Sequence, residues 1–440
     1  MKALHPLSNS RLLLAMAILT SPARAGDVGS EDAGSTAGRG PAVEWAVPPA
    51  GADGWPRACS VHYPFCVRAP RNTPPATGAA LIAAADDAWG VLTGPLGLPA
   101  PEGAYGERWQ VYLVDRAVGG GDAFGASAGF VGREPTSAFD RGSSFGLVER
   151  RTAAGCALDR AIARAIARGS LWRSAPATDP GSAAAETEML ARLATPCAPI
   201  DRDDLEAFQS HPTRCIVDSS SVPFDRGASI LFDWLDARFG TRPGALVEGL
   251  WALSPTRTRA ATWEDGHWAP APTGFDVLRV SLNGALWPGS TLDDVFVEFA
   301  VWRASSPTTP FPSVAWHLPW PVHARRLASP EPVAPTGASY VLVDHAGAPI
   351  GARLRVEAQW EDYARMRWII VKLDGAGHPL AEIPVRSLDR ATSASMTVDA
   401  LDDVARTLIV GVNVGSTERP FDPGQEEWEP HGWLLTIAGE

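Results

Sequence analysis

The chain has very little lysine and no concentrated excess of positive charge. Of its 38 basic residues, only Lys2 and Lys372 are lysines, and these 38 face 50 acidic residues, for a formal net charge of −12. Phosphate binding requires a dense basic face, so nucleic acid is not an expected partner. The scarcity of lysine, together with abundant alanine, glycine and proline, indicates a GC-rich coding sequence rather than a particular function.

No apolar run is long enough to cross a membrane, which takes about 20 residues. The short apolar run at 12–19 (LLLAMAIL) follows Lys2 and Arg11 and precedes the small-x-small motif Ala23-Arg24-Ala25. A basic start, a short apolar core and such a motif are typical of a secretory signal peptide. We therefore predict no membrane span and an exported protein, secreted or periplasmic.

Cleavage is predicted between Ala25 and Gly26, which makes residues 1–25 the signal peptide. The residues removed contain three basic side chains and no acid, so the mature chain has 35 basic and 50 acidic residues, a charge of −15. The polar, small residues that follow predict a disordered leader over 26–42.

Neither the cysteines nor the histidines have the spacing of a zinc site. The five cysteines include no C-x2-C pair, and none of the nine histidines belongs to an H-x3-H pair. In an exported protein, the spacings instead predict two local disulfides, Cys59–Cys66 and Cys197–Cys215. Cys156 is then the odd cysteine, interpreted as a small buried apolar residue of a helix.

Helical periodicity dominates the chain up to about residue 306, with a few strand patterns near its start. Strands are predicted over 109–115, 127–132 and 143–150. Helices are predicted over 77–93, 152–168, 183–194, 224–240, 243–253 and 290–303. Together these predict an α+β domain over 43–306.

Strand patterns replace helical ones from residue 337 onward. Residues 353–360 alternate apolar and polar side chains, as a strand with one buried face does. Seven such strands are predicted over 340–344, 353–360, 367–373, 382–386, 395–399, 407–414 and 433–438. Short strands at this spacing predict an all-β sandwich over 337–440. Eight prolines in 307–336 predict an extended linker before it.

The order strand, edge strands, helix, acidic helix, and then FDRGASILFDWLDARFG (224–240), resembles the core of gluzincin-type secreted metallopeptidases. The resemblance covers roughly residues 77–256, and a C-terminal β-sandwich is often appended to such a core. It implies a zincin-like fold for the α+β domain. It also implies that the helix over 152–168 should carry the zinc motif H-E-x-x-H.

That motif is absent. The resemblance implies that Asp159 and Ala163 replace the two zinc histidines, that Arg160 replaces the general base, and that Glu186 or Glu188 stands at the third ligand position. Catalytic zinc needs three protein ligands, and an alanine has no donor atom. An arginine stays protonated and cannot act as a base. We therefore expect no bound metal, no cofactor and no catalytic residues at these positions.

An ion pair is the structural account that we prefer for the altered position. Arg160 or Arg164 could pair with Glu186 or Glu188, which balances charge without zinc. The two glutamates are two residues apart and therefore lie on different faces of their helix. The function expected is a non-catalytic binding or scaffold role in the envelope or extracellular space, with a protein or a glycan as ligand.

Two alternatives remain open at this point. The chain could be a hydrolase that uses Glu186 or Glu188 with unrecognised partners. Alternatively, the sandwich could bind carbohydrate by stacking Trp360, Trp368 and Trp433 on sugar, which requires exposed rings. Their places in alternating strands favour packing in the core instead.

Export is directly testable. Replacing Leu13 and Leu14 by Asp should trap the precursor, because charges in the short apolar core abolish the signal peptide. N-terminal sequencing of secreted wild-type protein should then start at Gly26, and material that starts at Met1 would contradict the prediction.

Overall fold

The computed structural model describes residues 49–103, 107–115, 126–130, 144–152, 154–174, 178, 180–197, 199–216, 221–257, 263–264, 267–268, 274–282, 290–362, 364–385, 391–415 and 429–440. The predicted signal peptide, the leader and the Ala25–Gly26 cleavage bond lie outside the described residues. The remainder is an α+β structure, as predicted. None of the helices among the described residues is long and apolar enough to cross a membrane.

The first sheet is mixed and has the strand order β1–β2–β3–β5–β4. Its strands are β1 (Arg57–Cys59), β2 (Phe65–Arg68), β3 (Trp109–Val114), β4 (Ala126–Phe130) and β5 (Ser144–Glu149). The three central strands run parallel, whereas the edge strands β1 and β4 pair antiparallel. All of β3 is buried, as expected for a central parallel strand covered on both faces.

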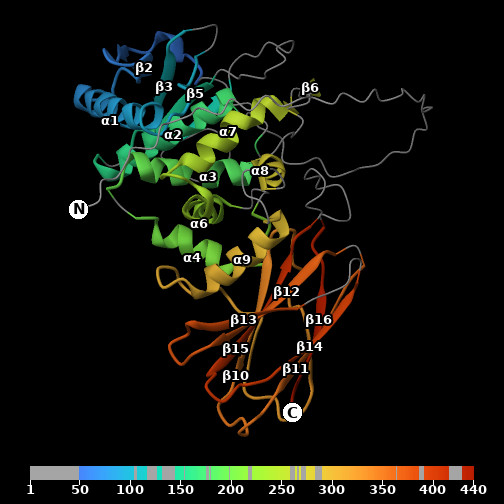
Figure 1. Ribbon diagram of the computed structural model, residues 1–440. Coiled ribbons are helices and arrows are strands. Elements are labelled where there is room, and N and C mark those ends of the chain that lie inside the picture. The colour runs from blue at the N-terminus through green and yellow to red at the C-terminus, as the bar shows by residue number, and fades with distance from the viewer. Residues whose placement is uncertain are drawn as a thin grey trace, which may run out of the picture. The chain divides into compact units, whose positions relative to one another are not determined.

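Helix α1 (Pro75–Thr93) connects β2 to β3 (Figure 1). It packs through the buried side chains of Leu81, Trp89 and Leu92. The later helices are α2 (Cys156–Ser174), α3 (Pro180–Ala194), α4 (Arg202–Ser210), α5 (Val222–Gly227), α6 (Ser229–Phe239), α7 (Ala245–Arg257), α8 (Gly274–Leu282) and α9 (Leu292–Ser305). A short hairpin, β6 (Trp263–Glu264) and β7 (His267–Trp268), lies between α7 and α8. The single helix predicted over 224–240 is wrong, because the chain turns at Ala228 and forms α5 and α6.

The predicted disulfide Cys197–Cys215 is also wrong. The structure joins Cys156 to Cys197, with their Cα atoms 5.7 Å apart. Helices α2 and α3 run antiparallel, so the first residue of α2 meets the residues that follow α3. Helix α4 occupies much of the stretch between Cys197 and Cys215. Cys215 lies outside both bridges, and its Sγ accepts a hydrogen bond from Thr336 Oγ1 at 3.7 Å.

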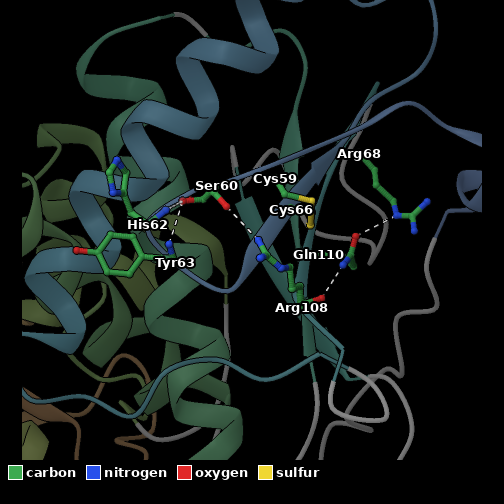
Figure 2. Close-up of a disulfide and its surroundings, with 8 residues drawn as sticks. All are labelled: Cys59, Ser60, His62, Tyr63, Cys66, Arg68, Arg108 and Gln110. Carbon is green, nitrogen blue, oxygen red and sulfur yellow. Dashed lines mark hydrogen bonds between the residues drawn. A yellow bond between two sulfur atoms is a disulfide. The ribbon is translucent and has the colours of Figure 1, made fainter.

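The predicted Cys59–Cys66 disulfide is confirmed, and it joins directly paired residues of β1 and β2 (Figure 2). Ser60, the residue after Cys59, stabilises the turn that connects β1 to β2. Its Oγ accepts the backbone N–H groups of His62 and Tyr63 at 3.0 Å each and donates to Asp86 Oδ1 of α1 at 2.5 Å. These bonds attach the edge of the sheet to α1.

The C-terminal residues form two sheets that face each other, as predicted for a sandwich (Figure 1). One sheet has the order β13–β12–β15–β10–β8 and the other β14–β11–β16–β9. The seven predicted strands correspond to β10 (Ala338–Asp344), β11 (Leu354–Trp360), β12 (Met366–Leu373), β13 (Pro379–Val385), β14 (Ser393–Val398), β15 (Arg406–Asn413) and β16 (Trp433–Gly439).

The predicted linker over 307–336 supplies two further strands of these sheets. β8 (Trp316–Leu318) pairs parallel with β10, and β9 (Arg325–Ala328) pairs antiparallel with β16. Both are edge strands, which is where a proline-rich stretch can pair, because proline donates no hydrogen bond to a ladder. This stretch is therefore not a free spacer. The division into domains at 43–306 and 337–440 stays a prediction.

The central strands of the first sandwich sheet, β10, β12 and β15, are buried on both faces. Val341 and Val343 point into the core shared with the second sheet, whereas Tyr340 and Leu342 join the core of the helices. The hydroxyl of Tyr340 donates to the carbonyl of Ala300 in α9 at 2.9 Å. This explains why β10 is buried almost throughout, while β11, with one free face, alternates.

Loss of the Cys156–Cys197 disulfide should lower stability. Replacing both cysteines by serine should cost about 4 kcal/mol in the free energy of unfolding, the loop-entropy expectation for a separation of 41 residues. Urea unfolding measures this cost, and Cys215→Ser serves as a control that should cost much less. A peptide map that shows Cys197 bonded to Cys215 would contradict the assignment.

Candidate functional site

The position that resemblance assigns to zinc is occupied by a buried ion cluster. Arg160 Nη1 donates to Glu188 Oε1 at 3.0 Å, and Arg164 Nη1 donates to Glu188 Oε2 at 2.7 Å. Glu188 is 2% exposed. Both carboxylate oxygens of Glu188 are thus engaged by α2. The Arg–Glu contact that we preferred from the sequence is present, with Glu188 rather than Glu186 as the acid.

A third arginine completes what we call the Glu188 cluster, namely Glu188, Arg160, Arg164 and Arg192. Arg192 Nη1 lies 3.9 Å from Glu188 Oε1 and donates to Ser229 Oγ at 2.6 Å, while its Nη2 pairs with Asp233. Arg160 also donates to the side chain and the carbonyl of Thr195, at 3.1 and 3.2 Å.

Electrostatics keep Glu188 ionised inside the protein. Burial raises the pKa of its carboxyl, but the charges of Arg164 and Arg192 and a bond from Arg164 more than offset this, so that its pKa lies below the ordinary value. Burial also lowers the pKa of Arg160, whereas the charge of Glu188 and its hydrogen bond raise that pKa. A buried pair of this kind is stable only because every charge has a hydrogen-bonded partner.

Sequence reasoning missed the acids and bases around this cluster. Asp204 of α4 lies 3.6 Å from Arg226 of α5, and burial raises the pKa of Asp204 to about 6. Arg192 could have been found, because it lies four residues after Glu188 on the same helix face. Asp233, Asp204 and Arg226 come from other helices, and no local pattern brings them here.

Glu186 faces the other side of α3, as the spacing of the two glutamates predicted. Its side chain is completely buried, and its Oε2 accepts the indole N–H of Trp251 in α7 at 2.6 Å. Its Oε1 has no hydrogen-bond partner among the described residues. Burial raises the pKa of Glu186 to about 7, against the opposing effects of the Trp251 bond and the charge of Arg168.

The residues at the altered positions do not fit a zinc ion. Ala163 packs in the apolar core without exposure, and Asp159 lies half-buried one turn earlier. Arg160 presents a cation, and Glu188 has both oxygens bound to guanidinium groups. The described part of the chain contains no group of three or more histidine, cysteine, aspartate or glutamate side chains that could hold a metal.

The three tryptophans considered for sugar binding are core residues. Trp360, Trp368 and Trp433 are 7%, 4% and 3% exposed. The rings of Trp368 and Trp433 meet edge to face, with centroids 5.8 Å apart. Core packing is confirmed, and stacking of these three rings on a carbohydrate is therefore wrong.

No protein-family model matches the chain, and no curated protein matches it. Several solved structures match part of it, among them a collagenase domain and a chitosan-binding module. The pre-peptidase C-terminal domain of collagenase from Bacillus anthracis is 7% identical, covers 30% of this chain and 100% of its own, and has a TM-score of 0.19. The chitosan-binding module 1 derived from chitosanase/glucanase from Paenibacillus sp. IK-5 is 19% identical, with 31% and 81% covered and a TM-score of 0.16. At such TM-scores neither similarity carries an argument about fold or function.

Breaking the Glu188 cluster should destabilise the protein strongly. Glu188→Gln leaves three arginines around a neutral group and should cost about 3–5 kcal/mol in the free energy of unfolding, because buried charge loses its partner. Urea unfolding at neutral pH measures this. The matched control is Glu206→Gln, whose exposed partner Arg202 lies 2.7 Å away and whose loss should cost less than about 1 kcal/mol. Equal losses in the two variants would contradict the role assigned to the cluster.

Proposed function

We propose that this chain is an exported, non-catalytic binding or scaffold protein whose helical part keeps the frame of a zincin-like peptidase. The observation that carries the proposal is the Glu188 cluster. In the position that resemblance reserves for a metal, two arginines of α2 hold a glutamate of α3. The cluster supplies packing and charge balance in place of a reactive centre.

The order of elements supports the zincin-like frame. A central strand β3 is followed by the antiparallel edge strand β4, then β5, α2 and the acidic helix α3. This is the order on which the resemblance rests. Helix α4 comes next, and α5 and α6 then cover most of the stretch 224–240 on which the resemblance rests.

The chemistry of the cluster supports a non-catalytic role. A zinc peptidase needs a base that can take a proton from water, and the guanidinium of Arg160 cannot do so. It also needs carboxylate oxygens that are open to a ligand, whereas those of Glu188 each accept an N–H group. Restoring either function would require changing several side chains at once.

The alternative of a hydrolase has one observation in its favour. A carboxyl with a pKa of about 7, such as Glu186, is suited to general acid–base chemistry. However, Glu186 is completely buried behind the indole of Trp251, so no substrate reaches it in this conformation. We therefore place the binding or scaffold role first.

Export and the choice of ligand belong to the same proposal. Two disulfides among the described residues support an oxidising compartment, the periplasm or the extracellular space. A protein or a glycan is the proposed ligand. A glycan would have to bind without Trp360, Trp368 and Trp433, because these rings are buried in the core.

Zinc content tests the proposal directly. The purified mature protein should retain no stoichiometric zinc after dialysis and should show no zinc-dependent peptidase activity, because Ala163 provides no ligand. The triple variant Asp159→His, Arg160→Glu, Ala163→His should gain zinc, with Glu188 freed from Arg160 as a candidate third ligand. Elemental analysis measures both.

Ala163→His alone is the matched control and should bind no stoichiometric zinc, because Arg160 still occupies Glu188. Circular dichroism establishes that each variant is folded before its metal is counted. About one zinc per wild-type chain would refute the non-catalytic proposal.

A further inference from the structure

Glu186 occupies a seam between three helices. It belongs to α3, its indole donor Trp251 belongs to α7, and Arg168 of α2 is the cation that acts on it. Its Oε1 is buried without a hydrogen-bond partner among the described residues, whereas Oε2 has one. No group of three or more histidine, cysteine, aspartate or glutamate side chains that could hold a metal includes Glu186 among the described residues. An incompletely satisfied carboxyl in this setting is costly to ionise.

Few charges face this carboxyl from the surrounding helices. On α3 itself, Glu188 points to the opposite side, toward Arg160 and Arg164. On α2, burial lowers the pKa of Arg168 to about 10, opposed by the charge of Glu186.

The acids of the other helices that pack here are engaged elsewhere. Glu248 of α7 pairs with Arg242. Asp236 of α6 accepts the backbone N–H groups of Gly244 and Leu246 at 2.8 and 2.9 Å. Asp86 of α1 accepts the hydroxyl of Ser60. Among the described residues, Arg168 is the charged group that lowers the pKa of Glu186.

We propose that Glu186 is a proton-operated latch, in which the protonated carboxyl keeps α7 closed on α3 and loss of the proton promotes local opening of α7. Opening admits water to the carboxylate, which supplies the hydrogen bonds that Oε1 lacks in the closed seam. The proposal concerns regulation by pH and does not depend on the binding or scaffold role.

The direction of the effect follows from proton linkage. In the closed seam the pKa of Glu186 is about 7, and in water it returns to its ordinary value of 4.5. Between these two values the closed state holds a proton that the open state releases. Rising pH therefore favours opening, by up to about tenfold in the opening constant per pH unit, and the effect levels off above pH 7. Below pH 4.5 both states are protonated and pH has no effect through this group.

Hydrogen exchange of the full mature chain tests the latch. Exchange rates of peptides from α7 (Ala245–Arg257), divided by the intrinsic rates at each pH, give the opening constant. For the wild type we expect this constant to rise at least tenfold from pH 5 to pH 7. Peptides from β15 in the sandwich should change less than twofold, which separates the latch from general loosening.

Two variants isolate the carboxyl. Glu186→Gln removes the proton equilibrium but keeps the shape, so the rise in the α7 opening constant should vanish. Glu382→Gln, an exposed control in β13, should keep it. A flat wild-type profile, or a rise that persists in Glu186→Gln, overturns the proposal.

A third variant decides the matter if Glu186→Gln fails to fold. Trp251→Phe keeps a ring in the seam but removes the donor that lowers the pKa of Glu186. The pH at which opening levels off should therefore move upward. An unchanged levelling-off pH in Trp251→Phe overturns the proposal.

Discussion

The arrangement of the central helices depends on the buried carboxylate of Glu188. A charge with 2% exposure is unfavourable by several kcal/mol unless hydrogen-bonded cations surround it. Arg160 and Arg164 meet that requirement from α2, and Arg192 adds a third guanidinium from its own helix. The bonds of Arg160 to both Glu188 and Thr195 favour one relative register of α2 and α3.

Other features of the helical region reinforce the same register. The Cys156–Cys197 disulfide joins the two helices close to the point where Arg160 binds Thr195. Arg192 extends the cluster to Asp233 of α6. The Glu188 cluster is thus the electrostatic centre of the helical packing. Loss of the Glu188 cluster would therefore affect the stability of the protein as well as any function nearby.

The helices and the sandwich share one sheet as a common layer. Asp293 of α9 accepts hydrogen bonds from Arg365 and Arg367, at 3.2 and 3.0 Å, beside the first sandwich sheet. Arg303 of α9 lies over the ring of Phe208 in α4, 3.7 Å from its centroid. Burial lowers the pKa of Arg303 to about 10, and it remains cationic at neutral pH. These contacts explain how a sheet with two apolar faces is covered on both sides.

The sequence by itself determined most of the helices and the main strands of the sandwich. Apolar periodicity predicted α1, α2 and α3 and the strands β10 to β16, because it reports which side of each element is buried. Ala163 and Arg160 argued against a zinc site from their side-chain chemistry alone. Only the tertiary structure decided that Cys197 bonds Cys156, that Glu188 rather than Glu186 accepts both arginines, and that residues 316–318 and 325–328 complete the sandwich. Each of these depends on which elements pack side by side, and distances between residues far apart in the chain leave no local pattern.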